Sequence, residues 1–493
     1  MRKGLSSDAG PRYSEDMMKP SNSGLSAAQY VEKSFEAHLE DLISLARIPS
    51  VSFAGFPKEE VVRSAEAVAD LMRRRGLENV RLVRTGNAHP YVCGERLRAP
   101  GKPTLLLYAH HDVQPAGRLE VWKSAPFEPT FREGPGGLRL YGRGTADDKA
   151  GVIVHFAAID AFLQTAGELP LNVKVVIEGE EETGSEHLSQ FLKENRDWVQ
   201  ADVLVLTDTA NFDCGHPALT VALRGMIAVD VELKALEHSL HSGMWGGPIP
   251  DPVQGLSRML ASLVDDQGQI AIPAIRSRVR ELTEEDLAEL KQIPENEAEF
   301  RKAGSMLPGV EFWRQGPSLL GQTWLFPSLT VTAIQASSRS TPSNIINESA
   351  WARITLRLSE GFDPSETTQM LVDHLKSVVP WGMHLELKTD WGSGAWSVKA
   401  RGPVYEAAVS ALTEGYGREA LKIGCGGSIP FVKPFAEALG GAPALLIGVE
   451  DPYTQAHSEN ESLLVSDLKK ACLSQVLLFD RLASLPEKDW KRS

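Results

Sequence analysis

The stretch TLLLYAHHD, residues 104–112, joins a short apolar run directly to two histidines and an aspartate. Three more apolar runs of similar length follow it: NVKVVIE (172–178), VLVLT (203–207) and ALLIGV (444–449). Runs this short and this apolar are typical of strands that are buried on both faces of a mainly parallel sheet. Helical patterns alternate with them, as in AAQYVEKSFEAHLEDLISLARI and EEVVRSAEAVADLMRRRG. The sequence therefore predicts an α/β fold, with helices on both faces of the sheet.

The pattern changes between residues 224 and 392. MIAVDVELKA and ARITLRLSE alternate like half-exposed strands, and the charged, helical stretch RVRELTEEDLAELKQ lies between them. A chain of 493 residues is too long for one hydrophobic core. We therefore expect a flexible N-terminal tail (1–26), a discontinuous main domain (27–223 and 393–493) and an inserted α+β domain (224–392).

Composition narrows the possible partners and the compartment. The formal net charge of −14 disfavours nucleic acid and anionic membranes as partners. No run approaches the roughly 20 apolar residues of a membrane span, and the N-terminus lacks the apolar stretch of a signal peptide. The four cysteines, at 93, 214, 425 and 472, are widely scattered, which favours free thiols in a reducing compartment. We expect a cytoplasmic protein without membrane contact.

Histidines and carboxylates follow each of the strand-like segments. Because ligands of open α/β sheets bind at the carboxyl ends of the strands, these groups should gather at one edge of the sheet. They are HHD (110–112), DDK (147–149), the acidic run EGEEE (178–182), Asp208, and EDPYTQAHSENE (450–461) with His457.

Imidazole and carboxylate ligands without thiolates suit zinc, cobalt or manganese. Two imidazoles and three carboxylates are too many for one tetrahedral zinc, but they suit two metals that share a bridging carboxylate. Such a pair would acidify a water molecule, and a free carboxylate of the acidic run could take its proton. Taken alone, each motif has a plainer interpretation, such as a surface hydrogen bond, a solvated charge run, a turn or a helix cap.

Other hydrolytic and nucleotide-binding chemistries lack their motifs. The chain contains no H-E-x-x-H, no G-x-S-x-G and no Walker phosphate loop. GRGTAD (142–147) begins like a dinucleotide-binding fingerprint but ends in an aspartate where that fingerprint has a glycine.

The motifs taken together resemble the dinuclear zinc metallopeptidases that include carnosinase, cytosolic nonspecific dipeptidase, carboxypeptidase G and aminoacylase. The resemblance extends from about residue 30 to 485 and is closest to the dipeptidase branch. It is carried by AHHDVQPAG, YGRGTADDKAG, IEGEEETGS, HSGMWGG, GCGGSIP and AHSENES.

The resemblance implies a catalytic role for the main domain and a role for each matching residue. His110 and Asp208 would hold one metal, Glu182 and His457 the other, and Asp147 would bridge them. Asp112 would orient the His110 imidazole. Glu181 would be the general base and acid that serves the attacking water and then the leaving amine. Zinc is the expected metal, with manganese or cobalt as alternatives.

The inserted domain resembles the lid and dimerisation domain of the family, so a homodimer is expected. His241 would stabilise the tetrahedral oxyanion, typically in the active site of the other subunit. Arg357 would bind the terminal carboxylate of the substrate. Asn344, Gly427 and Ser428 would complete the substrate contacts.

Two segments depart from the family pattern and bear on the substrate. The lid motif usually reads Asp-Leu-His-Ser-Gly, but Ser239 replaces its aspartate, and RSTPSNIINESA differs from the usual Lys-Thr-Val-Ile-Pro pattern. A dipeptide is the expected substrate, and an N-acyl or N-succinyl amino acid is the alternative. A third interpretation is a non-catalytic binding homologue, which the complete set of ligands and Glu181 disfavours.

Overall fold

The computed structural model describes residues 19–313, 316, 318–390, 392–429 and 431–490. These residues form two compact units. The first unit contains the described residues of Met1–Thr220, Lys399–Ile423 and Pro434–Ser493. The second contains those of Val221–Val398 and Gly424–Lys433.

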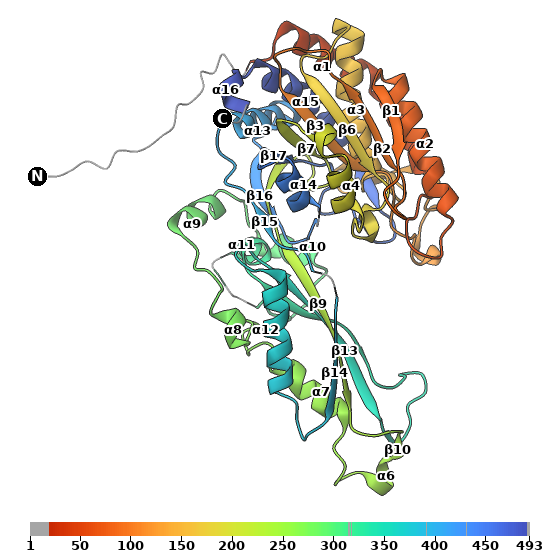
Figure 1. The fold of residues 1–493 in the computed structure, drawn as a ribbon, viewed down its shortest axis with the longest axis vertical. Helices are drawn as coiled ribbons and strands as arrows, with labels where there is room; N and C mark the ends of the chain where they lie inside the picture. Colours follow the sequence, from red (N-terminus) through yellow and green to blue (C-terminus); the bar gives the residue numbers. More distant parts are fainter. Residues whose placement is uncertain (1–18, 314–315, 317, 391, 430, 491–493) are drawn as a thin grey trace, which may run out of the picture. The chain divides into compact units, whose positions relative to one another are not determined.

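A mainly parallel sheet forms the centre of the first unit (Figure 1). The middle strands pair in parallel in the order β6-β3-β7-β17, and β1, β2 and β8 add antiparallel pairs at the sides. The middle strands are almost entirely buried, which explains why they contain so few polar residues. The predicted α/β class is thus confirmed. The strands that this unit contributes are β1 (Glu78–Val83), β2 (Tyr91–Arg96), β3 (Thr104–His110), β6 (Asn172–Glu178), β7 (Val203–Leu206), β8 (Ala218–Leu223), β16 (Leu421–Cys425), which pairs with β8, and β17 (Ala444–Leu446).

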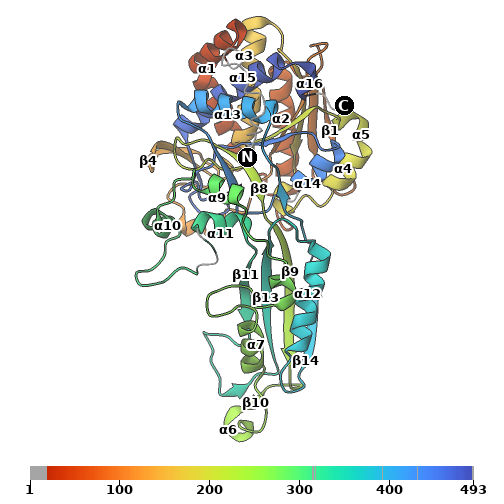
Figure 2. The same cartoon turned by 90° about the vertical axis from the view of Figure 1, so that its left-hand side faces the viewer.

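Helices cover both faces of this sheet (Figure 2). On one face α3 packs on β3, and α1 and α15 pack on α3. On the other face, Phe191 of α4 stacks on Tyr91, and Phe435 of α14 meets the ring of Tyr108 edge-on. The helices of this unit are α1 (Asn22–Ala46), α2 (Lys58–Arg74), α3 (Lys149–Ala166), α4 (Leu188–Glu194), α5 (Arg196–Val199), α13 (Pro403–Tyr416), α14 (Val432–Ala438), α15 (Val465–Ser484) and α16 (Glu487–Trp490).

A separate antiparallel sheet of three strands joins distant parts of the chain. Its strands β4 (Thr130–Gly134), β5 (Gly137–Tyr141) and β18 (Ser462–Leu464) pair in the order β18-β5-β4. The pairing places Ser462 opposite Tyr141. Residues on either side of position 142 and position 461 are therefore neighbours in space.

Helix α1 begins inside the segment that the sequence predicts as an N-terminal tail, residues 1–26. Helix α1 begins at Asn22 rather than after residue 26, because the side chain of Ser21 caps it by accepting a hydrogen bond from the Gly24 N–H at 3.1 Å. The Ser21 N–H also donates to Asp480 of α15 at 2.7 Å, so the start of the helix is anchored to the fold. Residues 1–18 of the predicted tail lie outside the described residues.

The second unit is built on an antiparallel sheet with the order β11-β13-β9-β14. Side chains of β13 alternate between buried and half-buried, as the sequence pattern indicated, and the buried ones pack with helices α7 and α12. The elements of this unit are β9 (Gly225–Lys234), β10 (Leu240–His241), α6 (Ser242–Trp245), α7 (Pro252–Ala261), α8 (Pro273–Arg276), α9 (Glu284–Leu290), α10 (Glu297–Ala303), α11 (Leu319–Leu325), β11 (Ser328–Gln335), β12 (Ile345–Ile346), β13 (Ser349–Leu358), α12 (Pro364–Ser377), β14 (His384–Thr389) and β15 (Trp396–Ser397).

The charged helical stretch RVRELTEEDLAELKQ forms a shorter helix than its pattern predicted. Helix α9 begins only at Glu284, because Thr283 and Asp286 form a capping box at its start. No described helix combines the length and the apolar composition needed to cross a membrane.

Candidate metal centre

The five predicted ligands all lie in the first unit, close to the carboxyl ends of the parallel strands. His110 is the last residue of β3, and Asp208 lies two residues after β7. Glu182 lies in a short 3-10 turn that follows β6, and Asp147 lies just before α3. His457 belongs to the segment between β17 and β18. The edge of the sheet thus gathers side chains from positions far apart in sequence.

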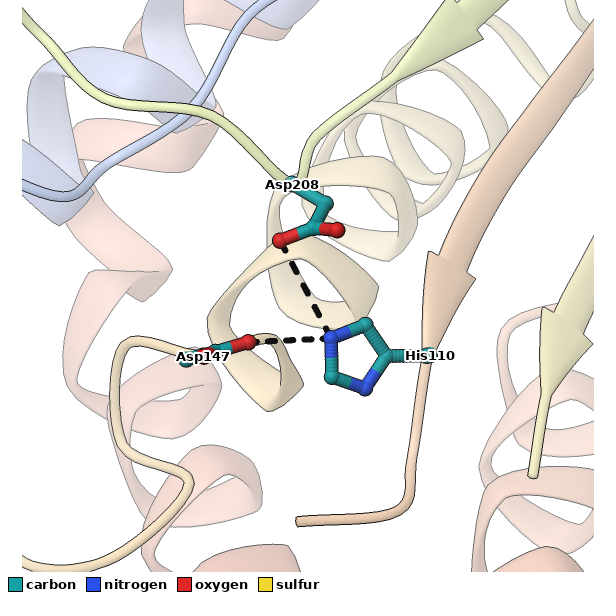
Figure 3. Close-up of side chains that lie close together, drawn as sticks. All are labelled: His110, Asp147 and Asp208. Carbon is teal, nitrogen blue, oxygen red and sulfur yellow. Dashed lines mark hydrogen bonds and ion pairs between the residues drawn. The ribbon is translucent and has the colours of Figure 1, made fainter. Parts of the chain in front are cut away.

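Two groups of potential ligand atoms converge here and share Asp147. In the first group, His110 Nε2 lies 2.9 Å from Asp147 Oδ1 and 3.9 Å from Asp208 Oδ1 (Figure 3). In the second group, His457 Nε2 lies 2.9 Å from Asp147 Oδ2 and 3.2 Å from Glu182 Oε2. The two oxygens of Asp147 therefore face two different imidazoles, which is the arrangement expected of a bridging carboxylate.

The carboxylates of the centre raise the pKa of both histidines. Burial opposes a charge on His110, but the hydrogen bonds to Asp112 and Asp147 outweigh it and raise the His110 pKa well above its usual value. Hydrogen bonds to Asp147 and Glu182 raise the pKa of the exposed His457 to about 11. The same contacts hold the pKa of Asp147 below its usual value despite its burial.

The remaining carboxylates of the centre repel one another. Burial and the neighbouring Glu181 raise the pKa of Asp208, and burial and Asp147 raise that of Glu182. Burial, with further contributions from Glu182 and Asp147, also raises the pKa of Glu181. The site thus concentrates more negative than positive groups, and divalent cations would relieve that excess. The donor set fits such cations, because it combines imidazole nitrogens with carboxylate oxygens.

Asp112 contacts one residue of each ligand group, His110 in the first and Glu182 in the second. Its Oδ1 lies 3.4 Å from His110 Nδ1, and its backbone oxygen lies 3.1 Å from the same nitrogen. Its carboxylate also accepts the backbone N–H groups of Glu181 and Glu182, each at 3.1 Å. The hydroxyl of Ser52, which sequence reasoning missed, donates to Asp112 Oδ2 at 2.7 Å.

Gln114 is a second residue that sequence reasoning missed. Its backbone N–H donates to Glu182 Oε1 at 3.0 Å, and its side-chain amide donates to Glu182 Oε2 at 2.7 Å. Gln114 therefore orients both oxygens of Glu182. The available signal was the position of Gln114 in AHHDVQPAG, two residues after Asp112.

The predicted substrate contacts all lie in the second unit, where they form two groups. In the first, His241 ends β10 and is exposed, and the next residue donates its N–H to the backbone oxygen of Asn344 at 2.9 Å. At the position of the missing lid aspartate, the hydroxyl of Ser239 donates to the carboxylate of Glu348. A carboxylate therefore still lies close to this strand, although a different residue supplies it.

The second group joins Arg357 to the glycine-rich segment. Arg357 Nη1 donates to the hydroxyl of Ser428 at 2.8 Å. Arg224, which sequence reasoning missed, holds the same segment: its Nε donates to Gly426 O at 2.9 Å and its backbone N–H to Gly427 O at 3.2 Å. Arg357, Gly427 and Ser428 thus form one connected group.

Comparison with known proteins agrees with this geometry. Residues 106–479 match the peptidase family M20/M25/M40. The chain is 31% identical over 383 residues to cysteinylglycine-S-conjugate dipeptidase of Corynebacterium striatum, which covers 76% of this chain and 80% of that protein. It is 28% identical to β-Ala-His dipeptidase of Rattus norvegicus, over 91% of this chain and 93% of that protein.

A solved structure shares the fold over nearly the whole chain. Human carnosine dipeptidase 1 superposes with a TM-score of 0.82 at 27% identity, over 95% of this chain and 100% of that chain. The chain belongs to the peptidase family M20/M25/M40. The resemblance predicted from the motifs is thus confirmed, and the protein is a hydrolase of the metallopeptidase type.

Proposed function

We propose that this metallopeptidase cleaves dipeptides at a pair of divalent metal ions. His110 and Asp208 would hold one ion, Glu182 and His457 would hold the other, and Asp147, which belongs to both groups, would be shared between them. The observation that carries the proposal is the position of Asp147, whose two oxygens lie 2.9 Å from the imidazoles of His110 and His457. The names of two relatives, cysteinylglycine-S-conjugate dipeptidase and β-Ala-His dipeptidase, support a dipeptide as substrate.

Glu181 is the proton carrier in this proposal. When bound, a pair of divalent ions acidifies water and polarises the amide carbonyl. The Glu181 carboxylate, 3.9 Å from His110 Nε2, accepts the proton of the attacking water and then gives it to the leaving amine. Burial raises the pKa of Glu181, so its carboxylate is a stronger base toward the water and, once protonated, keeps the proton until the amine accepts it.

Substrate recognition is assigned to the second unit. Arg357 binds the terminal carboxylate of the dipeptide through its guanidinium group, and burial lowers its pKa. Ser428, Gly427 and Asn344 contact the backbone of the substrate. His241 donates to the oxyanion that forms at the scissile carbonyl.

We also propose that the inserted domain predicted at residues 224–392, which falls within the second unit, acts as the lid and dimerisation domain. In the resulting homodimer, His241 serves the active site of the other subunit. The exposure of His241 at the end of β10 supports this assignment, because the side chain is accessible to a second chain.

Zinc is the metal that we propose, since imidazole and carboxylate donors suit it, and manganese or cobalt can take the same positions. We assign the protein to the cytoplasm. The described part of the chain has no disulfide, and Cys93 and Cys472 are buried as thiols, which fits a reducing compartment.

The test is a substrate panel with the purified protein loaded with zinc, manganese or cobalt. Dipeptides are compared with N-acetyl and N-succinyl amino acids, and Glu181→Gln serves as the inactive control. We expect turnover of dipeptides, and turnover at least about 10²-fold slower in the control. Turnover of N-acyl or N-succinyl amino acids alone would replace the dipeptidase with a deacylase, and inactivity with every metal would refute both functions.

A further inference from the structure

Glu461 is a buried carboxylate that takes no part in the mechanism above. It lies four residues after His457, directly before β18, and its side chain is inaccessible to solvent. Oε1 accepts the backbone N–H groups of Ala146 at 3.0 Å and Asp147 at 3.2 Å. Oε2 accepts the N–H of Gly144 at 2.9 Å and Arg143 Nη1 at 2.7 Å. Every one of these donors belongs to the loop that carries Asp147.

Only a carboxylate can satisfy these contacts. Each oxygen receives two donors, so the two oxygens together offer the four acceptor positions that an ionised carboxylate provides. A glutamine would direct an NH2 group at two of the donors. The buried guanidinium of Arg143 supplies the opposite charge, which makes a buried carboxylate tolerable at this position.

The surrounding contacts join the two ligand segments that meet at Asp147. The backbone oxygen of Glu461 accepts the N–H of Gly142 at 3.0 Å. Arg143 Nη2 donates to Ser458 O at 3.0 Å, next to His457, and to Pro115 O at 3.1 Å. The loop that carries Asp147 and the segment that carries His457 are thereby held together by a main-chain hydrogen bond and by the Arg143 side chain.

This loop has little freedom to relax. Gly144 has a φ of +75°, a conformation that side-chain-bearing residues rarely adopt, and a Cβ there would lie 2.6 Å from Val113 Cγ1. The loop therefore passes close to the segment that follows His110. With the N–H groups of residues 146 and 147 bound to Glu461, the Asp147 backbone has a defined position between the two histidines.

We propose that Glu461 is a positioning residue of the metal centre. It contacts neither metal nor substrate, and it fixes the Asp147 loop so that the carboxylate of Asp147 can bridge two ions. It performs for Asp147 what Asp112 performs for the turn of Glu181 and Glu182, whose N–H groups Asp112 accepts. This inference rests on the proposed function, because it presupposes two ions bridged by Asp147.

The experiment uses two variants of the full-length protein. Glu461→Asp keeps the buried charge opposite Arg143 but withdraws the carboxylate by one methylene, so that it cannot reach all of its donors. The double variant Arg143→Met, Glu461→Gln removes both charges together and leaves no unpaired ion in the interior. Glu459→Gln is the matched control: Glu459 lies on the same segment but pairs with the exposed Arg118.

Each protein is stripped of metal and titrated with zinc and with cobalt, and the visible absorption spectrum of the cobalt form is recorded. We expect both Glu461 variants to bind metal about 10- to 100-fold more weakly, the range typical when a residue that supports a metal ligand is lost. Their cobalt spectra should change, kcat should fall and KM should stay within a small factor. Glu459→Gln should match the wild type in all of these measurements.

Thermal unfolding of the metal-free proteins separates positioning from stability. A Glu461 variant that is folded, yet binds both ions with wild-type affinity and an unchanged cobalt spectrum, would overturn the inference. The titration does not depend on the substrate. If the wild type itself binds no second ion, the proposed two-metal function fails, whereas normal binding by the wild type and by both variants refutes only the role of Glu461.

Discussion

Glu181 and Glu182 are adjacent in sequence but have different environments. Gln114 binds both oxygens of Glu182, which also lies beside His457, whereas Glu181 lies nearer to His110. We predict that Glu181→Gln lowers kcat by about 10²- to 10⁴-fold, the usual contribution of a general acid–base group. Metal analysis should still find two ions per chain. Loss of an ion from this variant would mean that the roles of the two glutamates are exchanged.

Glu178, at the end of β6, predicts a pH dependence of stability. It accepts hydrogen bonds from Tyr108 at 2.6 Å and Tyr91 at 3.2 Å, and burial raises its pKa from 4.5 to about 8. Because the folded state retains the proton more strongly than the unfolded state, this contribution to stability is complete below pH 4.5 and is lost as the pH rises through about 8. Each unit of pKa shift corresponds to about 1.4 kcal/mol.

The measurement compares Glu178→Gln with the wild type by chemical unfolding of the metal-free proteins at several pH values. The difference in unfolding free energy between the two should change steadily between pH 4.5 and 8, in the direction that favours the wild type at low pH. Glu186→Gln, a nearby exposed position, should show no such trend. A constant difference for Glu178→Gln across this range would contradict the prediction.

At the level of single elements, the alternation in β13 makes a prediction about stability. Truncating a side chain on its buried face should lower the free energy of unfolding more than truncating one on its other face. Ile354 is fully buried in the core of the second unit, whereas its neighbour Thr355 points to the opposite, half-buried face. We predict that Ile354→Ala destabilises the protein by about 2–5 kcal/mol, through lost burial and the cavity that remains. Thr355→Ala is the control and should cost clearly less. Equal losses in denaturant unfolding would show that the alternation does not define the core.

Strands that consist of one continuous apolar run could be predicted from the sequence. The strand predicted at 172–178 has the same bounds in the structure, and the apolar runs at 104 and 203 begin their strands at those residues. These runs are recognisable because burial on both faces requires an unbroken apolar stretch. The bounds of α1 and α9 were less accurate, because caps such as Ser21 and Thr283 determine where a helix begins.

The contacts around the site could not be predicted in the same way. His110, Asp147 and His457 stand out because their residue types and positions after strands indicate metal ligands. Ser52 and Glu461 carry no such local signal, since their roles depend on partners between 60 and 318 positions away in sequence. Hydrogen bonds of this kind arise from tertiary structure, which residue spacing alone does not define.

At the level of the whole molecule, the proposed dimer predicts complementation between two inactive chains. His241→Ala should lower kcat without removing metal, because His241 is not among the metal-binding groups of the first unit. When it is mixed with Glu181→Gln under conditions that exchange subunits, heterodimers should regain part of the activity, since one active site then combines an intact Glu181 with an intact His241.

The matched control is His238→Ala, an exposed histidine three residues earlier on the same segment. This variant should keep wild-type activity and should give no gain on mixing with His241→Ala beyond its own contribution. If His241→Ala and Glu181→Gln remain inactive together although exchange of subunits is demonstrated, His241 serves the site of its own chain.

The discontinuous first unit has a consequence for the order in which the protein can mature. Strand β17 pairs in parallel with β7, although more than 230 positions separate them, and His457 and Glu461 follow it. A growing chain on the ribosome therefore presents β7 with an unpaired edge while more than 230 further residues are synthesised, and unpaired edges invite association with other chains. In the proposed centre, the second metal would be captured only after His457 has emerged. Full loading with metal would thus mark chains in which β17 and the His457 segment have joined the first unit.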